Sequence, residues 1–203
     1  MKKNKISKNW INKQRRDIFV KKSKIEGYRS RAVYKLQEID HKFKIFKNGI
    51  SVIDLGAAPG SWSQYALKNI KNGKIVSIDL LDFEKIGNIH QIKGDFTEDR
   101  YKKEIIDYFG SKVDVVLSDM AVNTTGNKNI DSIYTGELCM EAMQFSKNIL
   151  KKNGKFISKI FMGSTFNEII SEAKKIFKEN KVYKPLASRK GSKENFIICK
   201  FLR

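Results

Sequence analysis

The chain has 203 residues, 40% of them hydrophobic and 11% aromatic, which is typical of one folded domain and excludes a disordered segment. Its 41 lysine and arginine residues outnumber 22 acidic residues, and the formal net charge of +19 favours a polyanionic partner such as nucleic acid. A general bias of composition toward lysine is the alternative. The excess is uneven, however, because residues 1–24 carry ten lysines or arginines and one acid, Asp17.

Signals for membranes and metals are absent from the sequence. No apolar run could span a bilayer, and MKKNKISKNW leads into further charges instead of the apolar core of a signal peptide. We therefore expect a cytoplasmic protein with no membrane partner. Cys139, Cys199, His41 and His90 stand alone, without the spacing of metal ligands, so we expect reduced core cysteines and no metal.

The elements alternate along the chain. Residues 1–28 are basic and lack apolar periodicity, which predicts an N-terminal arm, followed by a single domain over 29–203. Apolar residues at helical spacing predict an amphipathic helix from Ser30 to Phe43. Beyond it, β-rich runs alternate with helical stretches, as in a parallel sheet flanked by helices. The predicted strands are 51–55, 74–80, 89–95, 113–119 and 154–161, and the predicted helices are 61–70, 97–109, 133–150 and 164–180.

The C-terminal segment differs from this alternation. It holds two strand-like pieces, KVYKP and NFIICKFL, joined by the polar loop SRKGSKE, which has no room for a helix. Such a connection implies a hairpin, and hence an antiparallel C-terminal strand at one edge of an otherwise parallel sheet. The fold class predicted is α/β, a mostly parallel central sheet with helices on both faces.

The loop after the first predicted strand lies within VIDLGAAPGSWSQY, residues 52–65. Ligands of open α/β sheets bind beyond the carboxyl ends of the strands, so this loop is the natural site. Gly56 and Gly60 let the backbone approach a ligand, and Pro59 fixes the turn. The dinucleotide pattern G-x-G-x-x-G is absent, which disfavours a phosphate-bearing cofactor and an NAD-dependent oxidoreductase.

Two acids follow the next two predicted strands. Asp79 stands 19 residues after Gly60, where an acid can hydrogen-bond ribose hydroxyls, and Asp95 could reach an adenine edge. A nucleoside without phosphates fits this arrangement. S-adenosylmethionine is such a ligand, and its sulfonium cation favours nearby carboxylates. The alternative is that both acids only terminate their strands.

Five segments together carry a family resemblance. They are YRSRAVYKL (28–36), VIDLGAAPGSWSQY (52–65), LSDMA (117–121), SKIF (158–161) and SRKGSKENF (188–196). In this order the chain resembles the FtsJ/RrmJ family of RNA 2'-O-methyltransferases, in particular its bacterial branch acting on 23S rRNA. The resemblance extends from about residue 10 to residue 201 and implies a Rossmann-like fold that depends on S-adenosyl-L-methionine.

The resemblance also implies site residues. The catalytic set is Lys35, Asp119, Lys159 and Glu194, and the cofactor site comprises Gly56, Pro59, Gly60, Trp62, Asp79, Asp95 and Asp119. The chain departs from the family at Ser61, where a second glycine is common before Trp62, and at Val122, where a proline commonly follows SDMA. Ser61 is small and suits a helix N-cap, so we expect cofactor binding to survive.

The resemblance makes Lys159 the base that accepts the proton of the attacking ribose hydroxyl. An aliphatic ammonium is almost wholly protonated at neutral pH, so the neighbours of Lys159 matter. We expect Asp119 and Glu194 to orient Lys159 and Lys35 to position the substrate. Without the resemblance, we would interpret Lys35 as part of a solvated helix face. Glu194 would then be an ordinary loop residue and Trp62 a packing residue. Lys159 interrupts an apolar strand, where a buried unpaired ammonium is costly.

The implied substrate is one uridine ribose in 23S rRNA of the large (50S) ribosomal subunit, methylated late in assembly by a monomer. Arg29 and Arg31 on one side, with Arg189, Lys190 and Lys193 on the other, predict a positive groove that flanks the cofactor pocket. Two alternatives stay open. One is a 2'-O-methyltransferase of tRNA or of an mRNA cap, and the other is a non-catalytic RNA-binding assembly factor.

Overall fold

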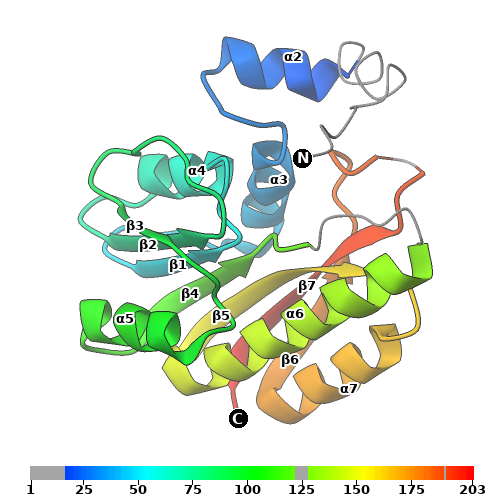
Figure 1. The fold of residues 1–203 in the computed structure, drawn as a ribbon. Helices are drawn as coiled ribbons and strands as arrows, with labels where there is room; N and C mark the ends of the chain where they lie inside the picture. The colour runs from blue at the N-terminus through cyan, green and yellow to red at the C-terminus, as the bar shows by residue number, and fades with distance from the viewer. Residues whose placement is uncertain (1–16, 122–127, 190) are drawn as a thin grey trace, which may run out of the picture.

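The computed structural model describes residues 17–121, 128–189 and 191–203 (Figure 1). Its helices are α2 (Ile18–Ile25), α3 (Val33–Phe43), α4 (Ser61–Asn69), α5 (Asp99–Phe109), α6 (Lys128–Ile149) and α7 (Phe166–Ile176). Its strands are β1 (Ser51–Leu55), β2 (Lys74–Asp79), β3 (His90–Lys93), β4 (Val113–Ser118), β5 (Leu150–Phe161), β6 (Phe177–Tyr183) and β7 (Glu194–Leu202). None of the helices in these ranges is long and apolar enough to cross a membrane.

One seven-stranded sheet in the order β3-β2-β1-β4-β5-β7-β6 forms the centre of the molecule. The first five strands in this order pair in parallel, and β7 pairs antiparallel with both β5 and β6. The predicted α/β class and the antiparallel C-terminal strand are therefore confirmed. The prediction that this strand lies at the edge is wrong, because β7 is inserted between β5 and β6 and β6 forms the edge.

The boundary between α7 and β6 also differs from the prediction. The predicted helix over 164–180 ends at Ile176, and the chain becomes extended at Phe177. The ring of Phe177 is fully buried and stacks on Phe156 of β5 at a centroid distance of 6.1 Å. Burial of this ring favours the extended conformation over another helical turn, so β6 starts earlier than the sequence pattern indicated. Helix α6 likewise begins earlier than predicted, at Lys128 instead of residue 133.

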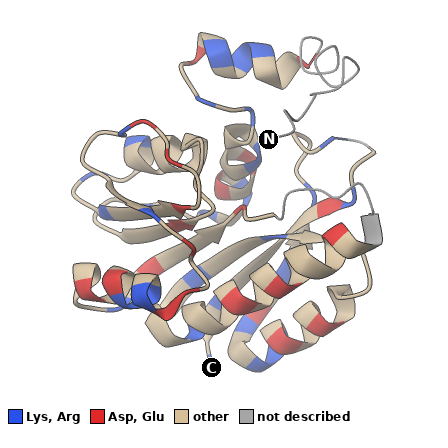
Figure 2. Cartoon of the chain, in the orientation of Figure 1, with Lys and Arg blue, Asp and Glu red and all other residues tan. Residues whose placement is uncertain are grey.

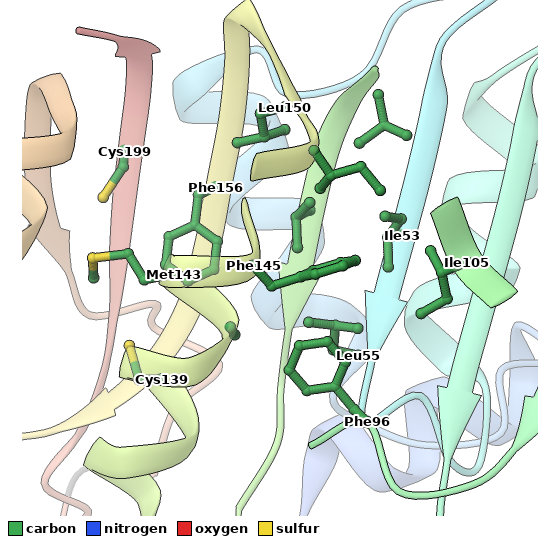
Figure 3. Packing of buried hydrophobic residues seen from close by; sticks show 14 of the residues in the cluster. Ile53, Leu55, Phe96, Ile105, Cys139, Met143, Phe145, Leu150, Phe156 and Cys199 are labelled. Atoms are coloured by element: carbon green, nitrogen blue, oxygen red, sulfur yellow. The ribbon is translucent and has the colours of Figure 1, made fainter. Parts of the chain in front are cut away.

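Helices cover both faces of the sheet, with α3 and α4 on one face and α5, α6 and α7 on the other (Figure 1). Alternate residues of a strand point to opposite faces, so Val52 packs beneath α3 and α4 whereas Ile53 packs beneath α5 and α6. Figure 3 shows the second of these clusters, in which Phe96, Phe145 and Phe156 fill the space between strands and helices. Cys139 and Cys199 are free and buried there, as predicted.

Part of the basic N-terminal arm is helical. Helix α2 stands above α3 and carries lysines over much of its length (Figure 2). The Oδ1 of Asp17 accepts the amide of Phe19 at 3.0 Å and so caps the helix, and the ring of Phe19 packs on Tyr34 of α3 at 5.3 Å. The rest of the arm, residues 1–16, lies outside the described residues. The division into an arm (1–28) and a domain (29–203) stays a prediction.

Candidate active site

The carboxyl edge of the parallel strands brings the predicted cofactor residues together. Gly56 follows β1 directly, Asp79 ends β2, Asp95 comes two residues after β3, and Asp119 follows β4. Because β3, β2, β1 and β4 are neighbours in this order, these four positions lie along one continuous edge. This is the edge at which α/β sheets bind ligands.

The loop between β1 and α4 requires glycine at two positions. Gly56 has a φ of +73° and Gly60 a φ of +103°, which side chains other than glycine rarely adopt. A Cβ on Gly56 would lie 2.9 Å from Cα of Met120, and one on Gly60 would lie 2.4 Å from Cδ1 of Ile86. The amides of Gly56 and Ala57 donate to the carbonyl of Ile78, which ties the loop to β2.

Ser61 differs from its predicted role, and Trp62 packs inside the protein. Ser61 is the first residue of α4 instead of its N-cap, which is Gly60, and its hydroxyl bonds that of Ser30 at 2.7 Å. The side chain of Trp62 is 2% exposed, donates its Nε1–H to the carbonyl of Ala32 at 2.9 Å and packs on Phe196. The structure thus gives the Trp62 side chain a packing role, and its contact with the cofactor stays a prediction.

The two acids of the cofactor site have different surroundings. Asp79 accepts the amide of Ala58 at 2.9 Å and that of Leu81 at 2.8 Å, so it fixes the glycine loop while its remaining lone pairs stay free for a ligand. The Oδ1 of Asp95 accepts the hydroxyl and the amide of Thr97, and these bonds lower the pKa of Asp95 below its usual range. Asp95 is therefore ionised at neutral pH.

Arg29 braces the cofactor loop, a role that the sequence did not reveal. Its guanidinium donates to the carbonyls of Pro59 (3.1 Å), Glu84 (2.6 Å) and Lys85 (3.2 Å). It therefore connects the glycine loop to the segment after β2. Arg29 was predicted as one of the cations of the groove, and in the structure its guanidinium bonds the protein's own backbone.

Lys159 and Asp119 form a buried ion pair. The Nζ of Lys159 donates to Oδ1 of Asp119 at 3.0 Å and also to the carbonyl of Asp119. The side chains are 8% and 16% exposed. In the sheet, Ser158 pairs with Ser118, so the residues that follow them, Lys159 and Asp119, are brought level by the parallel register. The third N–H of the ammonium is left for a substrate.

Lys35 and Glu194 form a second ion pair beside the first. The Nζ of Lys35, in the first turn of α3, donates to Oε2 of Glu194 at 2.8 Å, and both side chains are 13% exposed. Ser188 donates its hydroxyl to the other oxygen of Glu194 at 2.8 Å. Glu38 accepts the amides of Leu186 and Ala187 at 2.6 and 2.8 Å, which holds the loop before β7 on α3.

Charges alternate through these four residues. Burial alone would raise the pKa of Asp119, but the ammonium groups of Lys159 and Lys35 outweigh it and hold that pKa below its usual range. Burial alone would lower the pKa of Lys35, but Asp119 and Glu194 outweigh it and raise that pKa. Asp119 and Lys35 are therefore both charged at neutral pH, and all four predicted catalytic residues are brought together.

Two arginines lie on the rim of this site. Arg31 and Arg189 line a hollow of about 200 Å³ together with Lys35, Ser192 and Glu194. Asp17 pairs with Arg31 and lies 3.8 Å from Nε of Arg189, so the acid of the N-terminal arm holds both guanidinium groups. Lys190, predicted for this rim, and Val122, in the loop after β4, lie outside the described residues.

Asp54 lies in β1 directly beneath the glycine loop and is 1% exposed. Its Oδ2 accepts the hydroxyl of Ser63 at 2.5 Å, whereas its Oδ1 is buried without a hydrogen-bond partner in the described part of the chain. Burial raises the pKa of Asp54 to about 7, and the carboxylates of Asp119 and Asp79 add to the rise. No sequence pattern marked this group, because an acid inside a strand is also typical of polar alternation.

Replacing Asp54 by asparagine should remove a pH dependence of stability. A carboxyl whose pKa is raised by folding contributes stability that is full below its unfolded pKa, about 3.9, and is lost as the pH rises to about 7. The free energy of unfolding in urea should therefore fall between these limits in the parent, by about 4 kcal/mol at most, and less in Asp54→Asn. Asp107→Asn, on the exposed face of α5, is the control. If the free energy of unfolding depended equally on pH in the parent, Asp54→Asn and Asp107→Asn, the raised pKa of Asp54 would be contradicted.

The donor set of the edge fits a cationic nucleoside. Asp79, Asp95 and Asp119 offer acceptors to hydroxyl, amino and sulfonium groups, and Arg29 beside the loop is bound to carbonyls instead of being free for a phosphate. S-adenosylmethionine therefore fits the residues present. No group of three or more histidine, cysteine, aspartate or glutamate side chains that could hold a metal ion occurs among the residues that the structure describes.

Comparisons with known proteins show the family of the chain. The model of the FtsJ-like methyltransferase family matches residues 28–202. The chain is 68% identical, over the full length of both, to ribosomal RNA large subunit methyltransferase E of Pelagibacter ubique. It is 46% identical to the protein of the same name from Rickettsia akari, over 95% of this chain and 88% of that one.

Solved structures extend the comparison. A crystal structure of a putative ribosomal RNA methyltransferase from Plasmodium falciparum superposes with a TM-score of 0.77 at 32% identity, and covers 86% of this chain and 98% of that one. Human methyltransferase-like protein 13 in complex with SAH gives a TM-score of 0.57 at 15% identity over 75% and 72% of the two chains, which shows the shared fold alone.

Proposed function

The chain belongs to the FtsJ-like methyltransferase family, and we propose that it methylates the 2'-hydroxyl of a uridine ribose in 23S rRNA, late in assembly of the large subunit. The names of its bacterial relatives support ribosomal RNA as the substrate. The proposal places the protein in the cytoplasm, where bacterial ribosomes are assembled. Since all four catalytic residues come from one chain, it would act as a monomer.

One observation carries the proposal most directly. Two largely buried ion pairs, Lys159 with Asp119 and Lys35 with Glu194, lie at the carboxyl edge of the sheet next to the glycine loop. A buried ion pair contributes little net stability, because desolvation of the charges offsets their attraction. Two such pairs at a ligand-binding edge are therefore better explained by chemistry than by folding.

The cofactor would be held at the neighbouring strand ends. Gly56, Pro59 and Gly60 would supply its backbone wall, and Asp79 and Asp95 would accept its hydroxyl and amino groups. When bound, S-adenosylmethionine supplies an electrophilic methyl group on a sulfonium ion. The protein's task is then to align the ribose oxygen with that methyl group and to exclude water, which by itself accounts for much of the acceleration of such a reaction.

The proton of the ribose hydroxyl must leave as the oxygen–carbon bond forms. Lys159, as the neutral amine, accepts this proton on Nζ and becomes an ammonium ion, while the oxygen receives the methyl group. Asp119 fixes the position of Nζ through its carboxylate and stabilises the resulting cation. Lys35, fixed by Glu194, is placed to donate a hydrogen bond to the substrate ribose or to the adjoining phosphate.

RNA would reach this site along the positive rim. Arg31 and Arg189 are cations beside Lys35, and α2, which stands above α3, carries Lys21, Lys22 and Lys24 (Figure 2). Contacts of this kind bind phosphates and give affinity without naming a sequence. The chain's shape complementarity to an assembled subunit would then contribute to the choice of nucleotide.

Transfer of labelled methyl from S-adenosylmethionine to undermethylated bacterial large subunits tests the proposal. We expect label in one ribose of 23S rRNA, identified by nuclease digestion as a 2'-O-methyluridine, and less label in protein-free rRNA. Label in tRNA or capped mRNA instead would favour another 2'-O-methyltransferase. Tight binding to subunits without label in any RNA would favour a non-catalytic assembly factor.

A further inference from the structure

A second group of cations lies at the amino edge of the sheet, opposite the site described above. Four lysines line a hollow of about 430 Å³ there, with Ile45, Ile50 and Val115 at its apolar wall. They are Lys47, Lys151, Lys152 and Lys155, and we call them the basal lysine cluster. Lys155 precedes Lys159 by four residues in β5, so the cluster starts roughly 13 Å from the catalytic lysine along the strand.

The cluster contains more positive charge than its surroundings neutralise. The lining holds one acid, Asp114, whose carboxylate already accepts the amide of Ser51 and the ammonium of Lys151, each at 2.9 Å. Lys155 also lies directly opposite Lys200 in the antiparallel pair of β5 and β7, and like charges in this position repel. Burial lowers the pKa of Lys155, and Lys200 and Lys47 lower it further, while Asp40 and Asp114 offset only part of this shift.

The positions of Lys155 and of its neighbour Lys200 have a structural explanation. Lys155 donates to the carbonyls of Lys44 and Ile45, and Lys200 donates to that of Phe43 at 3.0 Å, so both satisfy carbonyls at the C-terminal end of α3. The other three lysines of the cluster, Lys47, Lys151 and Lys152, are exposed. Lys151 pairs with Asp114 at the surface, and Lys152 donates to the carbonyl of Arg203. Such exposed contacts contribute little to stability, so folding does not require Lys47, Lys151 and Lys152.

We propose that Lys47, Lys151 and Lys152 bind phosphodiester groups of the substrate RNA, at a distance from the nucleotide that is methylated. Lysines on flexible stems suit phosphates whose positions vary, because they act as mobile point charges instead of fixed forks. This inference rests on the proposed function, which places RNA at the opposite edge of the same sheet. A folded rRNA is large enough to contact both edges.

The test compares two variants that lose the same charge. The first replaces Lys47, Lys151 and Lys152 by glutamine, and the second replaces three exposed lysines of other surfaces, Lys103, Lys174 and Lys178. Affinity for protein-free rRNA is measured over a series of salt concentrations. Three lost phosphate contacts should reduce the slope of log K against log salt by about 2 in the first variant, and clearly less in the second.

Kinetics complete the test. The KM for rRNA should rise several-fold in the cluster variant, while kcat and the affinity for S-adenosylmethionine stay those of the parent. Equal slopes of log K against log salt for the two variants would overturn the inference. Unchanged binding to rRNA with weaker binding to whole subunits would also overturn it, because it would indicate an acidic protein surface as the partner of the cluster. If the parent transferred no methyl group, the proposed function would fail, but the binding comparison would still decide the role of the cluster.

Discussion

Replacing Lys159 by alanine should lower the single-turnover rate of methyl transfer by about 10³-fold, because the variant lacks the group that accepts the ribose proton. Lys159 is 8% exposed and its Nζ is fixed by Asp119 at 3.0 Å, so water would not readily take its place. The affinity for S-adenosylmethionine should change less than the rate, because Asp119 is the residue of the cofactor site that is bonded to Lys159.

The dependence of the parent's rate on pH separates a base from a merely structural lysine. If the reaction needs a neutral amine, the single-turnover rate should increase as the pH rises above neutrality. Lys159→Arg is the matched variant, since it keeps the positive charge but cannot lose a proton. A flat profile in the parent, or substantial activity in Lys159→Arg, would exclude Lys159 as the base.

The order of elements and the edge that binds the ligand could be predicted because they depend on local patterns. Apolar runs such as SVIDL mark buried parallel strands, and Gly56 and Gly60 are required by backbone conformations that the sequence signals directly. The early start of β6 was missed because burial of Phe177 against Phe156, a residue 21 positions earlier, overrides the helical pattern around it.

The catalytic set could not have been assembled from spacing alone. Lys35 and Glu194 are 159 residues apart, and their contact exists only because β7 returns beside β5 and places Glu194 near α3. Only the family resemblance brought them together before the structure did. Arg29, Glu38 and Ser188 support the site but belong to no local pattern that marks them. Arg29 and Glu38 bond backbone groups distant in sequence, and Ser188 bonds Glu194 across an irregular loop.

Replacing Asp119 by alanine should destabilise the fold by about 3 kcal/mol, in addition to lowering activity, because it leaves a buried ammonium without its carboxylate. Lys159 would lose both its ion pair and the charge that offsets its desolvation, and Lys35 would keep Glu194 alone. The free energy of unfolding, measured in urea at pH 7, gives this loss. This loss of stability should shrink below about pH 4. The pKa of Asp119 is lower in the folded than in the unfolded protein, so its carboxylate contributes stability above the unfolded pKa, and that contribution is lost as the pH falls through the folded pKa.

A double variant distinguishes the lost ion pair from lost packing. Lys159→Met removes the ammonium and keeps an unbranched side chain of similar length, so Asp119→Ala with Lys159→Met should unfold with a higher free energy than Asp119→Ala alone. The two single changes and the double change form a cycle whose coupling energy belongs to the pair. Since all three variants lack the base or its partner, each should transfer methyl groups about 10³-fold more slowly than the parent. A stable but slow double variant would show that the buried pair serves the reaction and not the fold, whereas a coupling energy near zero would refute the ion pair as the reason for the loss of stability.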